Sequence, residues 1–303
     1  MLFPTKSPAE KRADLRKAID GGGLLRFAGA YSPLIALLIE RIGFDGVYVG
    51  SSTLSNDLGL PDIGLVTQTE AAERSGAIAR VTALPTLVDV DTGYGEAVNA
   101  ARTVCELEDR GLAACHLEDQ VNPKRCGHLD NKAVIDADLM VERVRAAVAA
   151  RRDPNFLIVA RTDAAAVEGF DAAVARARAY AEAGADMIFP EAMVDEDGFA
   201  RFRAAVDAPL IANMTEFGKS PLLSADSLKS LGYQLVIYPA TAQRLAMKAV
   251  EQGLRQVLAD GTQQDLLPAM QTRAELYDLI RYDDYAGFDR GVAGALVDGT
   301  PPP

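Results

Sequence analysis

The chain has 303 residues, a mass of 32.3 kDa and a formal net charge of −12. This acidic balance argues against nucleic acid or an anionic membrane surface as a partner, and no run of about 18 apolar residues predicts a membrane span. Three cysteines and an amino terminus without the apolar core of a secretory signal indicate a reducing, cytoplasmic location.

Short apolar, β-branched segments alternate with longer amphipathic segments along the chain. The predicted strands are Leu24–Ala28, Gly46–Val49, Pro85–Asp89, Ala113–Leu117, Leu157–Ala160, Met187–Phe189, Leu210–Ala212 and Leu235–Tyr238. Alanine-rich patterns between them predict helices such as Ala97–Arg110, Leu139–Arg151, Ala172–Ala183 and Ala242–Leu258. This alternation predicts a parallel α/β architecture, and at this length a (β/α)8 TIM-type barrel. No Gly-x-Gly-x-x-Gly motif follows a predicted strand, which disfavours an open dinucleotide-binding sheet.

The domain organisation predicted from these patterns is a single barrel domain over residues 1–303. Its last part, from about residue 262 to 303, is expected to be a helical extension and tail. A helical pattern covers Leu266–Tyr277, and a segment rich in Gly and Asp follows it.

A reactive cysteine is predicted in the longest irregular connection, Asp119–Asp136, which follows the fourth strand and has the length of a lid. This connection contains the segment Lys124-Arg125-Cys126-Gly127-His128. Adjacent cations stabilise a thiolate, so we expect a lowered pKa for Cys126 and proton exchange near neutral pH. The alternative is a solvated basic loop in which the cysteine has no role.

Polar residues also follow five consecutive predicted strands, where barrel enzymes carry their chemistry. In chain order they are Asp89, Asp91, Glu118, Arg161, Glu191, Asn213 and Thr215. Asp89, Asp91 and Glu118 form a set of hard oxygen ligands suited to Mg²⁺ or Mn²⁺. Zinc is disfavoured because the chain has only two histidines. Each residue alone could instead cap a helix or lie in a solvated loop.

Cations gather near the same predicted strand ends. They are Lys124, Arg125, Arg161 and, in the eighth helix, Arg244. A metal with several guanidinium groups predicts a small polyanionic substrate that carries carboxylates or phosphate. For Arg244, an ordinary place on a helix surface is the alternative.

Together these motifs resemble the methylisocitrate lyases of the isocitrate lyase and phosphoenolpyruvate mutase superfamily. The similarity runs from about Arg26 to Tyr282. The matching stretches are Asp57–Asp62, Leu87–Gly95, Leu117–Gln120, Lys124–His128, Ala160–Ala164, Phe189–Ala192, Asn213–Gly218, Tyr238-Pro239 and Met270–Arg273.

The resemblance implies a Mg²⁺-dependent homotetramer in which the last helix packs on a neighbouring subunit. The implied reaction is retro-aldol cleavage of 2-methylisocitrate, a small tricarboxylate, to pyruvate and succinate. Asp91 would bind the metal directly, and Asp89 and Glu118 would bind it directly or through water. Cys126 would protonate the succinate carbanion, with Lys124, Arg125 and His128 setting its pKa, and Tyr48 would help to remove the hydroxyl proton. The substrate would be held by Gly50, Ser51, Ser52, Gly127, Arg161, Glu191, Asn213, Thr215, Arg244 and Arg273.

The sequence departs from the family after the second strand. The family usually has Ser-Gly and a small residue where this chain has Gly50-Ser51-Ser52. This difference bears on the identity of the substrate and not on the reaction class. Isocitrate lyases, the nearest alternative, are usually longer and have Trp in place of Phe189. Phe189 and Ile237 would leave an apolar recess for a methyl group, although both could simply be core residues.

More distant alternatives are also open. Phosphonate mutases of this superfamily lack the cysteine loop, whereas an oxaloacetate-processing hydrolase or decarboxylase could retain it. A barrel used only for binding would be expected to have lost metal or acid residues, and this chain retains them.

Overall fold

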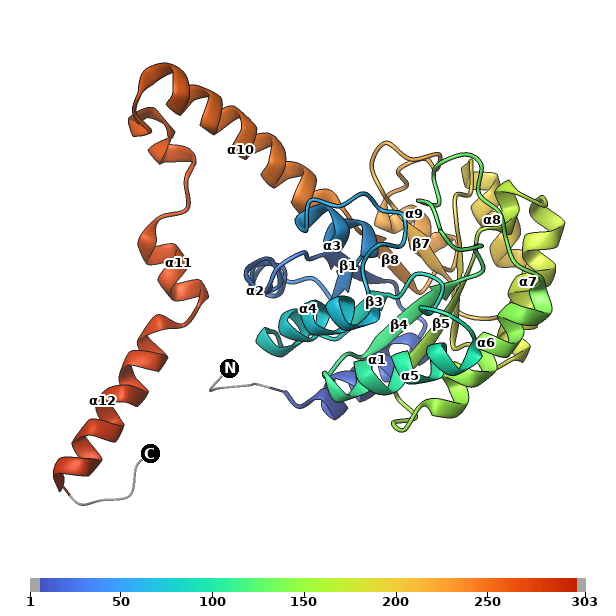
Figure 1. Cartoon of the computed structure of the whole chain (residues 1–303), viewed down its shortest axis with the longest axis horizontal. Helices are drawn as coiled ribbons and strands as arrows, with labels where there is room; N and C mark the ends of the chain where they lie inside the picture. The colour runs from blue at the N-terminus through green and yellow to red at the C-terminus, as the bar shows by residue number, and fades with distance from the viewer. Residues whose placement is uncertain (1–5, 299–303) are drawn as a thin grey trace. The chain divides into compact units, whose positions relative to one another are not determined.

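The computed structural model describes residues 6–298. The chain divides into two compact units, a barrel unit that ends at Arg244 and a C-terminal unit that begins at Leu245. Each unit is described by itself (Figure 1).

Eight parallel strands form the barrel. They are β1 (Leu25–Gly29), β2 (Gly46–Val49), β3 (Thr86–Asp89), β4 (Ala114–Glu118), β5 (Leu157–Thr162), β6 (Met187–Pro190), β7 (Ile211–Asn213) and β8 (Leu235–Tyr238). Their order in the sheet is β6-β5-β4-β3-β2-β1-β8-β7. A parallel bridge between Ile188 and Leu210 joins the two edge strands, so the sheet closes on itself. The predicted (β/α)8 fold is confirmed.

Helices surround the strands in the order that the alternating pattern predicts (Figure 1). They are α1 (Pro8–Asp20), α2 (Pro33–Ile42), α3 (Ser51–Asp57), α4 (Gln68–Val81), α5 (Ala97–Asp109), α6 (Ala137–Ala150), α7 (Phe170–Glu182), α8 (Glu196–Ala205), α9 (Ala225–Ser230) and the start of α10 (Thr241–Asp260), with a 3₁₀ turn at Ala164–Ala166. Local capping sets several starts. Thr67 and Glu70, for example, form a reciprocal capping box before α4.

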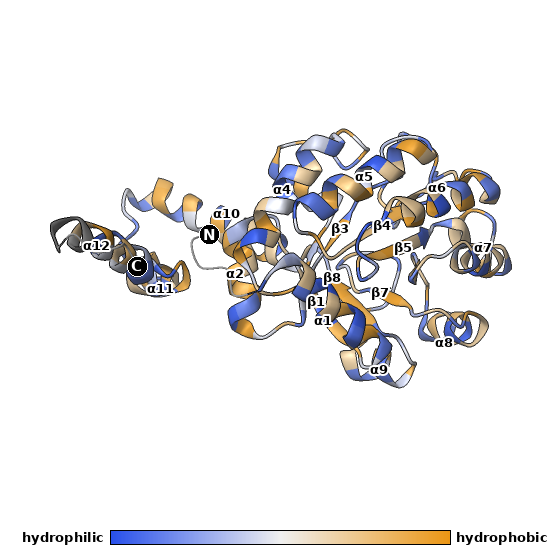
Figure 2. Ribbon diagram, turned by 90° about the horizontal axis from the view of Figure 1, so that it is seen from below, coloured by the Kyte–Doolittle hydropathy of each residue, from blue (hydrophilic) through white to orange (hydrophobic). Residues whose placement is uncertain are grey.

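The barrel is held by two apolar layers. One layer lies between strands and helices, and the other fills the barrel interior with residues such as Phe27, Leu87 and Val159. Leu15 and Ile19 of α1 belong to the inner layer and close the amino-terminal end of the barrel. Each such side chain contributes about 1.5–3 kcal/mol when fully buried. Figure 2 shows the apolar strands at the centre of a ring of helices.

The same alternation positions the polar residues of the barrel. Because successive side chains of a strand point to opposite faces, the inward row that contains Leu87 in β3 continues to Asp89. In β5 the inward row that contains Val159 continues to Arg161. Buried polar groups at the carboxyl ends are therefore carried on a rigid, packed support.

The C-terminal unit corrects the predicted helical pattern. Leu266–Tyr277 is not one helix. A 3₁₀ turn, Gln264–Ala269, contains Pro268, and the side chain of Thr272 then caps a new helix, α11 (Arg273–Leu279). The Gly- and Asp-rich segment that follows is also helical, as α12 (Tyr282–Asp298). The predicted extension over 262–303 stays a prediction, and residues 299–303 lie outside the described residues.

Between residues 6 and 298, the structure contains no helix that is both long enough and apolar enough to cross a membrane.

Candidate active site

An acidic cluster lies where β3 ends and α3 begins. Ser51 donates to Asp89 Oδ2 from its backbone N–H, at 3.3 Å, and from its hydroxyl, at 3.0 Å. Lys124 of the cysteine loop places its Nζ 2.9 Å from Ser51 Oγ and 2.8 Å from Asp91 Oδ1. The same ammonium also pairs with Asp62. One buried cation therefore joins carboxylates from separate loops.

A turn brings Asp91 to this cluster. Strand β3 ends at Asp89, and Asp91 has a left-handed backbone with φ of 50°, a conformation that Asp adopts more readily than most residues. The Asp91 N–H donates to Asp89 Oδ1 at 3.0 Å and fixes the turn. This turn brings the two carboxylates to the same cluster.

Burial and neighbouring charges shift the acidity of both aspartates. Burial raises the pKa of Asp91 to about 6 against the opposing charge of Lys124. Burial acts on Asp89 in the same direction, but His116, Lys124 and Arg161 outweigh it and lower its pKa to about 2. Because burial lowers the pKa of His116 itself, we attribute the low pKa of Asp89 chiefly to the lysine and the arginine.

Arg161 is the centre of a second network, on β5. Its Nε lies 3.2 Å from Glu118 Oε2 and 2.9 Å from Asp163 Oδ2, and one terminal nitrogen lies 3.1 Å from Glu191 Oε2. The guanidinium also lies over the ring of Phe189, 5.2 Å from its centroid. Three carboxylates therefore already share the donors of this arginine, and its contact with a substrate stays a prediction.

His128 pairs with Glu191, and Asn213 lies beside them. His128 Nε2 is 3.0 Å from Glu191 Oε1, while the backbone N–H of Lys219 donates to His128 Nδ1 at 2.9 Å. An Nδ1 that accepts a hydrogen bond assigns the ring proton to Nε2, so the ring is neutral and donates to Glu191. The amide nitrogen of Asn213 is 3.4 Å from both carboxylate oxygens.

The predicted effect of the basic loop on Cys126 is wrong in this structure. Burial raises the pKa of the Cys126 thiol, although the His128 backbone and the charge of Arg161 oppose the rise. Lys124 is directed to the aspartates, and Arg125 is exposed, with its backbone bonded to the side chain of Gln120. The thiol is therefore protonated at neutral pH, which is the state that a proton donor requires.

Gly127 allows the cysteine loop to lie directly on the second network. A Cβ atom at this position would be 2.3 Å from a terminal nitrogen of Arg161 and 2.4 Å from Glu191 Cγ. An antiparallel bridge between Gln120 and Val134 closes the base of the loop. The neighbouring Cys126 is thereby fixed at the carboxyl end of the barrel, beside the acidic residues.

Tyr48 meets a histidine that sequence reasoning did not select. The Tyr48 hydroxyl lies 2.9 Å from His116 Nε2, and the two rings are nearly parallel. Both residues are buried, and burial raises the pKa of Tyr48 well above its ordinary value. His116 is two residues before Glu118 on β4, so strand parity could have identified it as inward-facing.

The remaining predicted residues do not join these networks. Gly50 is the N-cap of α3, Ser52 lies in its first turn and Thr215 is half-buried after β7. Arg244 is half-exposed, 3.5 Å from Glu216 and over the ring of Phe217. Arg273 begins α11 in the C-terminal unit, and its role stays a prediction.

The carboxylates of Asp89, Asp91 and Glu118 are oxygen ligands of the kind that bind a divalent cation. Burial raises the pKa of Glu118, and its Oε1 has no hydrogen-bond partner among the described residues. A buried carboxylate oxygen without a partner is the kind of ligand that a hard metal ion takes. Within residues 6–298, however, no three carboxylate, imidazole or thiol side chains converge closely enough to hold one. The ligand set Asp89, Asp91 and Glu118 therefore stays a prediction.

Comparisons with known proteins agree over almost the whole chain. The profile of the phosphoenolpyruvate phosphomutase family matches residues 15–258. A probable 2-methylisocitrate lyase of Corynebacterium glutamicum is 56% identical, over 98% of this chain and 96% of its own. The 2-methylisocitrate lyase of Aeropyrum pernix is 48% identical, over 97% and 95%.

Solved structures show the same fold. A 2,3-dimethylmalate lyase superposes with a TM-score of 0.88 at 32% identity and covers 98% of this chain and 99% of its own. A phosphonopyruvate hydrolase in complex with oxalate and Mg²⁺ superposes with a TM-score of 0.85 at 30% identity, over 92% and 98%.

Lys132 holds the cysteine loop on the barrel and was not predicted. Its Nζ donates to the carbonyl oxygen of Gly127 and lies 2.8 Å from Asp163 Oδ1. Its side chain is only 2% exposed. Since Asp163 is also bonded to Arg161, one buried ammonium connects the loop to the second network.

We predict that Lys132→Met opens the loop. Removing one partner of a buried ion pair is strongly destabilising, and each 1.4 kcal/mol is tenfold in an equilibrium. In a Cys105→Ser background, the rate at which a thiol reagent labels Cys126 should rise about tenfold or more. Lys219→Met is the matched control, because it removes only an exposed ion pair with Asp130 on the same loop. Equal labelling rates in both variants would show that Lys132 does not hold the loop.

Proposed function

The chain belongs to the phosphoenolpyruvate phosphomutase family, and we propose that it is a carbon–carbon lyase that cleaves 2-methylisocitrate into pyruvate and succinate. The family predicted from the motifs is confirmed. The observation that carries the proposal is the sequence identity of 56% and 48% with 2-methylisocitrate lyases over nearly the full length of the chain. This activity would place the protein in propionate catabolism, through the methylcitrate cycle, in the cytoplasm.

The proposed reaction breaks one carbon–carbon bond. The substrate hydroxyl loses its proton and becomes the carbonyl of pyruvate, and the bonding electron pair remains on the succinate carbon, which then takes up a proton. The Tyr48 hydroxyl lies 2.9 Å from His116 Nε2, so in the proposed step the Tyr48 oxygen takes the proton of the substrate hydroxyl while the tyrosine passes its own proton to His116. Cys126, protonated because burial raises its pKa, is the proposed donor to the carbanion.

We propose Mg²⁺ as the divalent cation, with Mn²⁺ as a substitute. Asp91 would hold it directly, and Asp89 and Glu118 directly or through water. When bound, the ion would polarise the hydroxyl-carboxylate group and stabilise the enolate. Arg161, Glu191, Asn213, Thr215, Arg244, Arg273, Gly127 and the Gly50-Ser51-Ser52 backbone are the proposed contacts to the substrate.

The proposed assembly is a homotetramer in which the C-terminal helices pack on a neighbouring subunit. Within the C-terminal unit, the chain's own residues leave apolar side chains of α10 uncovered, among them Leu245, Leu254 and Leu258, which are 65–88% exposed. Exposed apolar surfaces of this kind are typical of association sites. Light scattering on the purified protein measures the assembly directly.

The first prediction concerns the metal. Asp91→Asn should weaken Mg²⁺ binding, measured by calorimetry with the ion alone, by about tenfold or more, because it removes a negatively charged oxygen ligand. The metal-stripped protein in excess chelator should lose cleavage activity and regain it when Mg²⁺ is added. Full turnover in the chelator would contradict the proposed site.

The second prediction concerns the thiol. Cys126→Ser should bind substrate and metal normally but lower kcat by about 100-fold or more, since a hydroxyl is far less acidic than a thiol. Cys115→Ser, on a buried strand face, is the control and should affect mainly stability. Steady-state kinetics with direct binding measurements separate the two effects. A near-wild-type kcat for Cys126→Ser would falsify the role of the thiol.

The third prediction concerns substrate choice. Phe189 and Ile237 are both 1% exposed in the barrel interior, and we propose that they form an apolar recess that takes the methyl group of the substrate. We expect 2-methylisocitrate to be preferred over isocitrate by roughly 10- to 200-fold in kcat/KM, the worth of one buried methyl group. A panel that also includes 2,3-dimethylmalate and oxaloacetate, with the products identified, measures this. Faster turnover of any other member would assign a different substrate.

A further inference from the structure

A further buried polar network lies on the outer side of the barrel, between the ends of β4 and β5 and helix α7. Its centre is Asp119, which directly follows β4 and is 0% exposed. Its carboxyl group contacts Tyr180 of α7, a residue of the apolar layer between strands and helices. The preceding residue, Glu118, contacts Arg161 instead. Asp119 is therefore separated from the barrel interior by the strands themselves.

The Asp119 carboxyl group meets four buried donors. Its Oδ2 accepts hydrogen bonds from the hydroxyl groups of Thr162, at 2.7 Å, and Tyr180, at 2.9 Å. A terminal nitrogen of Arg176 lies 3.4 Å from the same oxygen. Its Oδ1 accepts from the backbone N–H of Asp163 at 2.9 Å. One carboxyl group thus ties the end of β5, including the backbone of Asp163, to α7.

Two connections lead from Asp119 to the cysteine loop. Its backbone carbonyl accepts from the N–H of Ile135 at 2.9 Å, which joins the two ends of the loop. Its side chain holds the backbone of Asp163, whose own carboxyl group lies 2.8 Å from Lys132 Nζ. Lys132 in turn donates to the carbonyl oxygen of Gly127. The side-chain connection therefore runs from α7 to the residue next to the cysteine.

We propose that Asp119 is a positioning residue for the cleavage reaction. Its carboxyl group fixes Asp163 from the outer side of the barrel, and Asp163 holds Lys132 and with it the loop that carries Cys126. The described contacts of this carboxyl group are all with β5, Asp163 and α7, so its effect on the thiol passes through Asp163. The role in catalysis rests on the proposed lyase function, whereas the role in holding the loop does not.

Asp119→Asn tests this role, because an amide has only one accepting oxygen. Its NH2 group must face either the N–H of Asp163 or the guanidinium of Arg176, which leaves two buried donors opposed. In a Cys105→Ser background, the rate at which a thiol reagent labels Cys126 should rise about tenfold, equivalent to about 1.4 kcal/mol. The kcat for 2-methylisocitrate should fall about tenfold or more, since the thiol is displaced.

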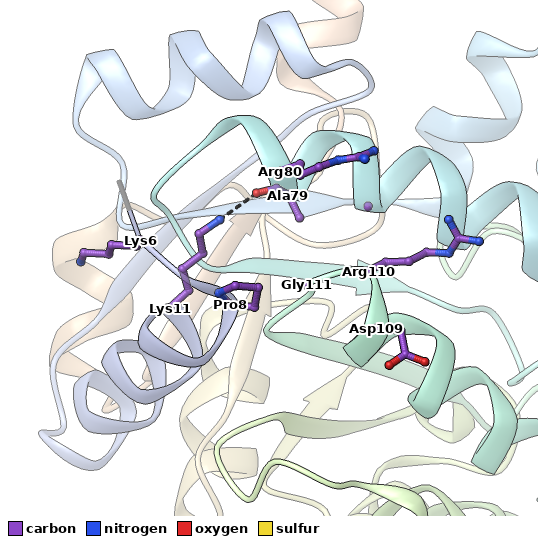
Figure 3. Close-up of a pocket in the computed structure, with 9 residues that line it drawn as sticks. Lys6, Pro8, Lys11, Ala79, Arg80, Asp109, Arg110 and Gly111 are labelled. Atoms are coloured by element: carbon purple, nitrogen blue, oxygen red, sulfur yellow. Dashed lines mark hydrogen bonds between the residues drawn. The ribbon is translucent and has the colours of Figure 1, made fainter. Parts of the chain in front are cut away.

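Glu108→Gln is the matched control. Glu108 is buried in the last turn of α5, at the amino-terminal end of the barrel, where α1 and α5 line a cavity (Figure 3). Its carboxylate also accepts backbone N–H groups, from Arg152 at 3.1 Å and Asp153 at 2.8 Å. Both amide variants should lower the midpoint of thermal unfolding. Only Asp119→Asn should change the labelling rate and kcat, and equal labelling rates in the two variants would overturn the inference.

A second pair of variants keeps the test decisive if Asp119→Asn does not fold. Tyr180→Phe removes one donor to Asp119, whereas Tyr233→Phe removes the bond of a similarly buried hydroxyl to the carbonyl oxygen of Phe199, 3.2 Å away. Labelling of Cys126 should rise about fivefold in Tyr180→Phe, the worth of one hydrogen bond, and stay unchanged in Tyr233→Phe. In that case, equal rates in these two variants would overturn the inference.

The path through Asp163 is tested by combining Asp119→Asn with Lys132→Met. Because both changes act on one chain of contacts, the double variant should label Cys126 at about the rate of the faster single variant, well below the rate of the urea-unfolded protein. Multiplied effects would overturn this path, and faster labelling with an unchanged kcat would overturn the role in the reaction. A wild type that does not cleave 2-methylisocitrate would contradict the proposed function alone, since labelling needs no substrate.

Discussion

The burial of Arg161 among three carboxylates is the constraint on which the active site depends. A guanidinium at the carboxyl end of β5 meets Glu118, Asp163 and Glu191 within 3.2 Å, so the group carries more negative than positive charge. Buried carboxylates left without partners would cost several kcal/mol each. Further donors must therefore come from elsewhere in the chain. The loop after β4 provides these donors, and their contacts determine the chemistry of the site.

The basic residues of this loop serve as counter-ions and hydrogen-bond donors. Lys124 meets Asp91, Lys132 meets Asp163 and His128 donates to Glu191. These contacts hold the loop on the strand ends, and Gly127 permits the close approach. Electrostatic pairing thus positions the loop, and an anionic substrate bound beside Arg161 would change the charge balance of the same network. If the proposed substrate binds beside Arg161, its charge and the position of the loop would be coupled.

The predictable part of the molecule is the part that local patterns determine. Strand period and helix caps are local, so the barrel and the polar strand ends were predicted within a few residues. Lys132 and His116 were missed because their importance comes from partners on other strands. The thiol pKa was predicted in the wrong direction because proximity in sequence was taken for proximity in space: Lys124 is two residues from Cys126, but its ammonium lies on Asp91.

That error concerns the protonation state of the free thiol and leaves its proposed role as a proton donor unchanged. A thiolate stabilised by adjacent cations would be a nucleophile or a base, and it would have no proton to give to a carbanion. A thiol whose pKa is raised by burial holds its proton until a stronger base forms beside it, and a carbanion adjacent to a carboxylate is such a base. The turn that places Gly127 directly on Arg161 and Glu191 holds the neighbouring Cys126 beside the same network. Burial of the loop therefore keeps the thiol protonated at the end of the barrel where the carbanion is proposed to form.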